Sequence, residues 1–306
     1  KTYTENQLFS PEISTTTGYS KLYVNAGKVT NKGIELALGF KQNIGPVDWK
    51  TTLLWSLNRN RIDQLLPEYT NEELGVTVHL DEMDVYSLGG AKQRLTVGGS
   101  MGDVYVNTMR TDEHGHIWMN SMTGTLETDK NNYVYAGNTN PKYTLSWRNE
   151  FNWKGISLGF MLNARVGGIG VSATQAVMDY YGVSKTSAEA RDNGGVKVNG
   201  QMIDAQTWYQ TIGANGTGYV GSMYVYSMTN VRLGELTLGY DIPINKWCKW
   251  ISGLNVSFVG RNLWMLYCKA PFDPESTAST GTYNQGMDYF MQPSLRSMGF
   301  SAKISF

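Results

Sequence analysis

The chain closes with the stretch Met298-Gly-Phe-Ser-Ala-Lys-Ile-Ser-Phe306, in which every second residue is apolar. Successive side chains of a β-strand point to opposite faces, so this pattern puts the apolar residues on one face and glycine, serine and lysine on the other. The stretch therefore predicts a strand with one apolar and one polar face.

The same two-residue period recurs along the chain, whereas no stretch has the period of an amphipathic helix of any length. Near Gly234-Glu235 the phase of the alternation slips, as it would at a β-bulge. Residues 1–8 are also expected to form the end of a further strand. The other alternating stretches are 31–44, 49–58, 143–153, 156–165, 236–240 and 254–261.

The two faces distinguish a membrane barrel from a soluble sandwich. A run of about 11 residues, tilted by about 45°, rises roughly 25 Å, which is the height of the apolar band of an outer-membrane barrel. Arg59, at a strand end, and Arg232, before the bulge, are expected exceptions to the charge pattern. Since a charge facing lipid at mid-depth costs about 2–4 kcal/mol, we predict an all-β fold, a transmembrane antiparallel β-barrel. A soluble β-sandwich binding module is the alternative. The charges on the polar face are Glu35, Lys41, Lys50, Arg148, Glu150, Arg165, Arg261 and Lys303.

The connections between the strands predict an orientation. Gly45-Pro46 and Lys154-Gly155 are tight turns, whereas the connections that follow Arg61, Val166 and Tyr267 are long. Outer-membrane barrels have short periplasmic turns and long external loops. We therefore expect the turns, and the chain end at Phe306, on the periplasmic side.

Composition narrows the functional classes. The 26 basic and 26 acidic residues give a formal net charge of zero, which argues against nucleic acid or an anionic surface as a partner of the chain as a whole. Charged residues make up 17% of the chain, below the roughly 25% of soluble domains. The motifs of serine hydrolases, zinc proteases and phosphate-binding loops are absent from the sequence, so we do not expect an enzyme.

An ordered set of short motifs resembles the C-terminal part of the SusC-like TonB-dependent transporters of Bacteroidetes. The resemblance runs from about Tyr3 to Phe306. The motifs are Asn31-Lys-Gly-Ile-Glu-Leu36, Asn138-Thr-Asn-Pro-Lys-Tyr143, Arg232-Leu-Gly-Glu-Leu-Thr-Leu-Gly-Tyr-Asp-Ile-Pro243, Gly260-Arg-Asn-Leu263, Asp273-Pro-Glu275 and Arg296-Ser-Met-Gly-Phe-Ser-Ala-Lys-Ile-Ser-Phe306.

The resemblance implies the C-terminal arc of a 22-stranded barrel that is filled by an N-terminal plug. It implies an integral protein of the bacterial outer membrane that imports oligosaccharides or peptides, driven by the TonB complex and capped by a SusD-like surface lipoprotein. All 306 residues would then belong to the barrel domain, with the plug and the first part of the barrel outside this chain. The closing strand, with Phe300, Ile304 and Phe306, is similar to the signal that the barrel-assembly machinery recognises. A passive porin or an adhesin barrel is the alternative function.

Aromatic residues of the long loops are the candidates for contact with a substrate or a lid, because their rings offer flat apolar area with a polar handle. The polar-face charges Arg148, Glu150, Arg165 and Arg261 are expected to face the lumen and to pair with one another or with the plug. His114-Gly-His116 is interpreted as a polar loop, with no metal site expected, and no cofactor is expected except for a possible calcium ion at Asp273 and Glu275. Gly168-Ile-Gly-Val-Ser-Ala173 imitates a dinucleotide fingerprint, but we expect neither the βαβ context nor the helix that such a site needs. The aromatic candidates are Tyr181, Trp208, Tyr209 and Trp118.

Overall fold

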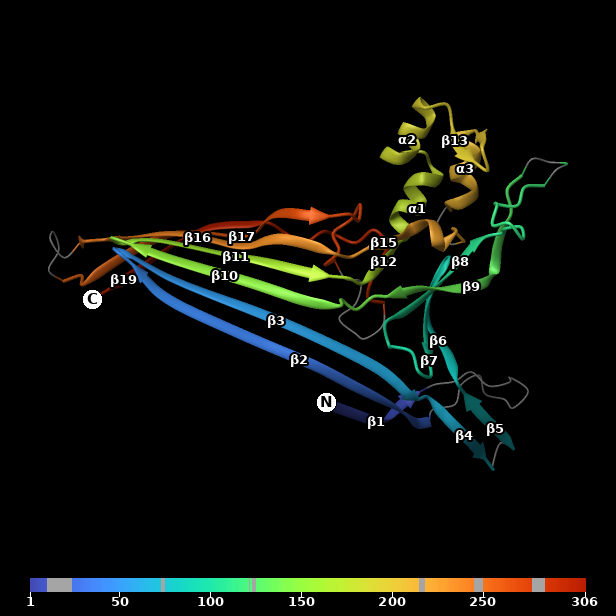
Figure 1. Cartoon of the computed structure of the whole chain (residues 1–306), viewed down its shortest axis with the longest axis horizontal. Helices are drawn as coiled ribbons and strands as arrows, with labels where there is room; N and C mark the ends of the chain where they lie inside the picture. The colour runs from blue at the N-terminus through green and yellow to red at the C-terminus, as the bar shows by residue number, and fades with distance from the viewer. Residues whose placement is uncertain are drawn as a thin grey trace.

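The computed structural model describes residues 1–9, 24–72, 75–120, 122, 125–214, 218–244, 250–276 and 284–306. Within these residues, eight strands form one antiparallel sheet, which we call the wall, in the order β1-β2-β3-β10-β11-β16-β17-β19 (Figure 1). All seven stretches predicted from the alternation are present, and the strand expected at residues 1–8 pairs with the next one. The wall strands are β1 (Thr2–Phe9), β2 (Val24–Ile44), β3 (Val47–Gln64), β10 (Tyr143–Trp153), β11 (Ile156–Val166), β16 (Asn230–Ile242), β17 (Gly253–Cys268) and β19 (Ser297–Ser305).

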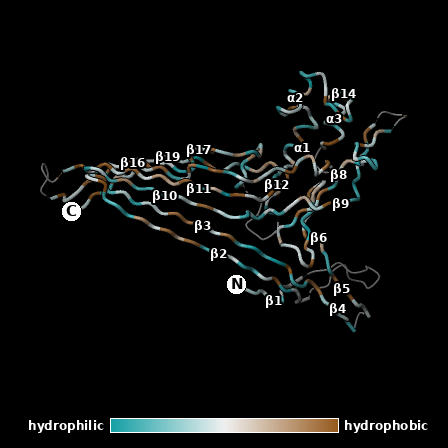
Figure 2. Tube along the Cα trace, viewed as in Figure 1, coloured by the Kyte–Doolittle hydropathy of each residue, from teal (hydrophilic) through white to brown (hydrophobic). Residues whose placement is uncertain are grey.

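The register of the wall confirms a continuous apolar face. Leu36 of β2 lies opposite Trp55 of β3, which lies opposite Leu145 of β10. Polar and apolar residues follow one another along β2 and β3 (Figure 2). In the described part of the chain no buried core covers this face, so it has the character of a lipid-facing surface rather than of a sandwich core. Exposed residues of the face include Ile34, Leu38, Phe40, Trp147, Leu238 and Phe300.

The two ends of the wall differ as predicted. The tight turns at Gly45-Pro46 and Lys154-Gly155 join neighbouring strands at one end, which we call the turn end. The C-terminus lies at this end, and the long connections leave the wall at the opposite end, the loop end (Figure 1).

A bulge in β16 decides the direction of Arg232. The pairing with β11 shifts between Leu233 and Glu235, so the predicted bulge is confirmed. Leu233 lies opposite Leu162, while Arg232 lies opposite Asn163 on the polar face. Arg232 breaks the alternation of residues 236–240, as expected for a residue before the bulge, and because the bulge reverses the phase of the strand its side chain lies on the polar face.

Arg59 is not at a strand end, because β3 continues as far as Gln64. Arg59 keeps the phase of the apolar face and pairs with Lys32 of β2. The strands thus extend beyond the apolar band toward the loop end, where a charge in this phase no longer meets hydrocarbon.

The first long connection is folded rather than irregular. It forms a two-stranded sheet, β4-β5, and a four-stranded sheet, β6-β7-β8-β9, neither of which was predicted. These strands are β4 (Leu66–Asn71), β5 (Val76–Leu80), β6 (Glu82–Leu88), β7 (Ala91–Thr96), β8 (Asp103–Met109) and β9 (Thr128–Asn138).

The second long connection contains three α-helices within the described residues, so the expectation of no helix was wrong. Each has only eight residues, too few for a period of 3.6 to stand out in sequence. Side chains of Ser172, Ser184 and Asp204 cap their N-termini. None of the helices in the described ranges has the length and apolar character that crossing a membrane requires. The elements are β12 (Ile169–Ser172), α1 (Ala173–Tyr180), α2 (Lys185–Asp192), β13 (Val196–Val198), β14 (Gln201–Ile203), α3 (Ala205–Ile212), the 3₁₀-helix η2 (Gly221–Tyr224) and β15 (Val225–Ser227), with β18 (Met287–Asp288) from the third connection.

A helix does follow the glycine-rich stretch 168–173, contrary to expectation. However, β12 pairs antiparallel with β15 and parallel with the two-residue β18, which is not a βαβ unit. The hydroxyl of Ser172 accepts the hydrogen bond of the Gln175 N–H at the start of α1. The stretch is therefore a capped strand-to-helix junction.

The connections pack into one lobe at the loop end, which we call the loop lobe. Tyr219 O–H donates to the Leu88 carbonyl at 2.6 Å, which ties the helical connection to the four-stranded sheet. At Gly90 the backbones meet so closely that a Cβ would lie 2.1 Å from the Tyr219 carbonyl oxygen. The buried core of the lobe is Ala91, Val104, Val106, Met109, Leu126, Val171, Ala173, Ala176, Val198, Trp208, Ile212, Tyr219, Val220, Tyr224 and Met287.

Candidate functional site

A chain of alternating charges crosses the polar face of the wall. Glu150 lies 3.8 Å from Lys50 and 2.7 Å from Arg148. Glu235 lies 4.0 Å from Arg148 and 3.9 Å from Arg261. These side chains are partly exposed, so the pairs add little stability. They present both signs of charge to whatever occupies the polar side.

Three of the four charges expected to face the lumen belong to this chain of ion pairs, and Arg165 does not. Arg165 lies near the loop end of β11, where its Nη2 donates to the Thr139 carbonyl at 2.7 Å. It therefore fastens the first long connection to the wall, a role that its spacing in the sequence did not indicate.

A second charge cluster is buried at the loop end of β16. The guanidinium of Arg232 lies 2.9 Å from Asp273 and 3.3 Å from Glu275. Its Nη1 also donates to Asn262 Oδ1 at 3.0 Å. Asp273 further accepts the Ser294 N–H at 3.0 Å. The third connection is thus held to the wall by its acidic turn.

The cluster sets the protonation of Asp273, which lies outside the membrane-spanning part of the wall. Burial by itself would raise the pKa of this carboxyl. Hydrogen bonds from Ser294, from the Glu275 N–H and from Arg232 outweigh burial and lower the pKa to about 2. Asp273 and Glu275, the two acids suggested for a calcium ion, are therefore paired with the guanidinium of Arg232 in this structure.

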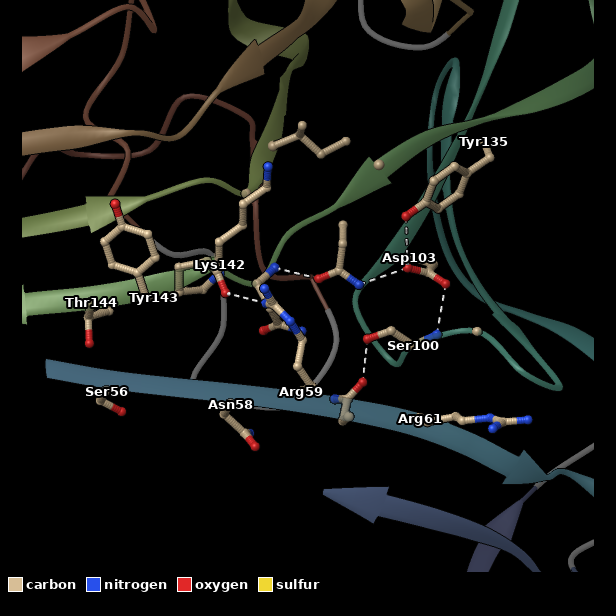
Figure 3. A pocket seen from close by; sticks show the side chains of 18 of the residues that line it. Ser56, Asn58, Arg59, Arg61, Ser100, Asp103, Tyr135, Lys142, Tyr143 and Thr144 are labelled. Carbon is tan, nitrogen blue, oxygen red and sulfur yellow. Dashed lines mark hydrogen bonds between the residues drawn. The ribbon is translucent and has the colours of Figure 1, made fainter. Parts of the chain in front are cut away.

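A cavity of about 780 Å³ opens where β3 and β10 separate beyond their last pair, Thr144 and Ser56 (Figure 3). Three cationic side chains, Arg59, Arg61 and Lys142, line it together with several asparagines. The single carboxylate among its lining residues, Asp103, is already engaged: it accepts from the Ser100 N–H at 2.8 Å, from Asn138 Nδ2 at 2.7 Å and from Tyr135 at 3.4 Å. The excess of positive charge suits an anionic or strongly polar ligand.

The sequence did not predict this cavity, because its lining comes from β3, the β7–β8 turn, β9, the start of β10 and residues 168–169 at the start of β12. A local signal existed only for its cations, since Arg59 falls in the apolar phase beyond the apolar band. Asn149 was missed as well: it lies on the apolar face, is buried, and accepts from Trp49 Nε1 at 3.1 Å.

Two of the four aromatic candidates come together in the helical part of the loop lobe. Tyr181 and Tyr209 line a cavity of about 370 Å³ together with Arg191. Tyr181 is 57% exposed, and its ring packs edge-on against Tyr180 at 5.2 Å between centroids. Burial, and next the charge of Asp179, raise the pKa of Tyr209, so its hydroxyl stays protonated and able to donate.

The other two candidates lie elsewhere. Trp208 is only 8% exposed and belongs to the core of the loop lobe. Its expected role as a contact residue is corrected to that of a packing residue, because neighbouring side chains already cover its indole. Trp118 lies in the hairpin of the first connection, with the guanidinium of Arg110 4.5 Å from its ring centroid.

The expected assembly signal lies on the closing strand of the wall. Phe300 pairs with Phe258 across β17 and β19, and Ile304 pairs with Leu254. Phe300 and Phe306 are both largely exposed. The closing strand β19 therefore carries exposed apolar side chains from its middle, at Phe300, to the turn end, at Phe306.

We compared the chain with known protein families, curated proteins and solved structures. A scan against protein-family models finds no match. The chain is 23% identical over 333 residues to TonB-dependent receptor P3 of Formosa agariphila, and 22% identical over 329 residues to TonB-dependent receptor P26 of the same organism. Each match covers 99% of this chain and 31% or 32% of the relative, so the chain spans about a third of the curated relatives' length.

Solved structures give the same result for the fold. A structure of the RagAB peptide transporter superposes with a TM-score of 0.66 at 15% identity, covering 98% of this chain and 31% of that one. The RagAB peptide importer in its open-open state gives a TM-score of 0.63 at 16% identity, with 99% and 32% covered. Both comparisons agree with the resemblance that the sequence motifs carry: the chain is similar over nearly its whole length to TonB-dependent receptors, and it has the fold of the corresponding part of a RagAB structure.

Proposed function

We propose that this chain forms the C-terminal part of the barrel domain of a TonB-dependent nutrient importer of the bacterial outer membrane. The observation that carries the proposal is the wall itself, an open antiparallel sheet with an uncovered apolar face. The likeness to TonB-dependent receptors over 99% of the chain supports it.

In this proposal the chain performs no chemistry. The wall spans the membrane, with the turn end and the C-terminus in the periplasm and the loop lobe outside. The polar face lines the lumen, where the ion pairs of Arg148 and Glu235 would meet the plug. The plug, and with it the coupling to the TonB complex, lies in sequence outside these residues. The barrel-assembly machinery would recognise β19 through Phe300, Ile304 and Phe306.

The substrate is an oligosaccharide or a peptide, delivered under a SusD-like surface lipoprotein. The loop lobe supports this choice, because its small cavity combines the aromatic faces of Tyr181 and Tyr209 with the guanidinium of Arg191. Aromatic rings stack on sugar faces and on peptide side chains, and an arginine binds carboxylates and hydroxyls. The resemblance to RagAB, whose name describes a peptide transporter, favours a test with peptides first.

The test uses the whole transporter that contains this chain, expressed in its host. Uptake of fluorescent oligopeptide and oligosaccharide pools is measured with and without functional TonB. We expect uptake of one pool that stops when TonB is inactivated. Uptake that continues unchanged without TonB would establish a passive porin instead.

A double variant, Tyr181→Ala with Tyr209→Ala, tests the contact surface. We expect uptake at limiting substrate to fall about tenfold, since each aromatic contact contributes roughly 0.5–1.5 kcal/mol. The matched control is Tyr69→Ala with Tyr289→Ala, two exposed tyrosines outside that cavity. Equal uptake by the double variant and its control would remove this surface from the proposal.

A further inference from the structure

Two cations face each other on the lipid side of the wall. Lys32 of β2 and Arg59 of β3 are a directly opposed cross-strand pair, and the next pair in the same phase contains Arg61. We call Lys32, Arg59 and Arg61 the basic patch. Like charges directly opposite one another destabilise a sheet, so the arrangement calls for a compensating partner.

The patch lies one step beyond the apolar band. Ile34 and Leu57 form the last apolar pair, and the alternation places Lys32 and Arg59 next, in the same phase and toward the loop end. At about 3.3 Å per residue, the two-residue step is roughly 6–7 Å along the strand. This is the level at which lipid headgroups meet a membrane protein.

The opposite face at this height is closed. Val29 and Ile62, which point to the polar side, are 2% and 0% exposed, and they pack with Leu95 of the loop lobe. Lys32 and Arg59 are exposed, and the Arg61 side chain is 69% exposed. The patch therefore lies on the side of the sheet opposite Val29, Ile62 and Leu95, and its Arg59 and Arg61 also border the cavity beside the loop lobe.

Among the described residues, few carboxylates lie close enough to neutralise the patch. Arg61 has a distant ion pair with Asp63 at 3.7 Å, and that carboxylate also accepts the Thr30 hydroxyl. Among the residues that the structure describes, the guanidinium of Arg59 donates a hydrogen bond to the Pro141 carbonyl alone, at 3.5 Å. Neither Lys32 nor Arg59 forms an ion pair with any carboxylate in the described ranges. The cavity that Arg59 and Arg61 help to line gives a headgroup room beside them (Figure 3).

We propose that the basic patch binds the phosphate group of a lipid in the outer leaflet. Guanidinium groups hold phosphate through paired, charge-assisted hydrogen bonds, and an ammonium adds a point charge. The lipid's acyl chains would lie along the apolar face below, against Ile34 and Leu57. A lipid thus pairs its phosphate with the cations of the patch and packs its acyl chains on the apolar band, whereas free phosphate can form only the ion pair.

The test uses the whole transporter, purified in a non-ionic detergent and titrated in two arms, one with dihexanoyl phosphatidic acid and one with inorganic phosphate. Native mass spectrometry counts the bound molecules. The double variant Arg59→Gln with Arg61→Gln is compared with Lys41→Gln with Lys303→Gln, which removes the same charge from exposed positions on the polar face. Heat-modified migration on gels confirms that each barrel is folded.

We expect the patch variant to bind the lipid about thirtyfold more weakly than the wild type, or about 2 kcal/mol, since each cation near a membrane surface contributes roughly 1 kcal/mol. The control should match the wild type, and inorganic phosphate should bind at least tenfold more weakly than the lipid. If the double variant does not fold, Lys32→Gln alone should weaken lipid binding about fivefold. Equal lipid binding by patch variant and control would overturn the proposal. Inorganic phosphate binding as tightly as the lipid would overturn it in favour of a free-anion site.

Discussion

Replacement of Arg232 by methionine is expected to release the third connection from the wall. The substitution keeps most of the apolar stem but removes the guanidinium that lies 2.9 Å from Asp273 and 3.3 Å from Glu275. The side chain of Arg232 is 6% exposed and that of Asp273 is 10% exposed, so the carboxylate would be left in a place that water hardly reaches.

Removal of one partner from a buried ion pair costs about 3–5 kcal/mol. Asp273 would still accept the N–H groups of Glu275 and Ser294, which places the expected cost near the lower limit, at about 3 kcal/mol. Arg261 provides the matched control, because its side chain is 70% exposed and lies 3.9 Å from Glu235. Exposed pairs of this kind contribute about 0–1 kcal/mol.

Hydrogen exchange of the whole transporter, followed by mass spectrometry, measures the difference. The reporters are the amides of Glu275 and Ser294, which donate to the Asp273 carboxylate. With a local opening that is about 3 kcal/mol easier, these amides should exchange roughly a hundredfold faster in Arg232→Met. In Arg261→Met the same amides should exchange at nearly the wild-type rate. If both variants leave the exchange of residues 269–276 and 284–296 unchanged, Arg232 does not hold this connection.

Three further predictions concern pH and the loop lobe. Because the folded-state pKa of Asp273 is lowered to about 2 from an ordinary value of 3.8, its stabilisation is complete above about pH 4–5 and is lost as the pH falls toward 2; proteolysis of the third connection by an acid protease across that range should follow this loss. Gly90→Ala should destabilise the loop lobe by more than about 3 kcal/mol, because its Cβ would meet the Tyr219 backbone; unaltered protease resistance of the lobe would contradict this. Trp208→Ala should cost the lobe about 3–5 kcal/mol and make it protease-sensitive, whereas Tyr181→Ala should leave protease resistance unchanged; equal resistance of these two variants would show that the indole does not support the core.

The sequence by itself determined the wall. Period-two alternation is a local property, and the lipid face forbids charge along each strand separately, so every wall strand could be recognised without knowledge of its neighbours. The tight turns at Gly45-Pro46 and Lys154-Gly155 and the slip near Gly234 are equally local. Arg232 was expected to break the alternation because it precedes the bulge, and the strand register shows that it lies on the polar face.

Only the tertiary structure decided what the long connections do. The helices α1, α2 and α3 have eight residues each, which is too short for a helical period to be recognised in the sequence. They are stabilised by packing as well as by their N-caps. Trp208 offers the same residue type to a ligand or to a core, and only its neighbours select the core.

The reason is the distance along the chain between partners. Tyr219 and Leu88 are 131 residues apart, and Arg232 and Asp273 are 41 apart. Such contacts form only after the wall strands have brought the long connections to the loop end, and they depend on which surfaces of the connections pack together. No local pattern in the sequence specifies that packing. The alternating strands therefore identify a membrane wall, while the surface proposed for substrate contact arises only from the way the connections pack at one end of it.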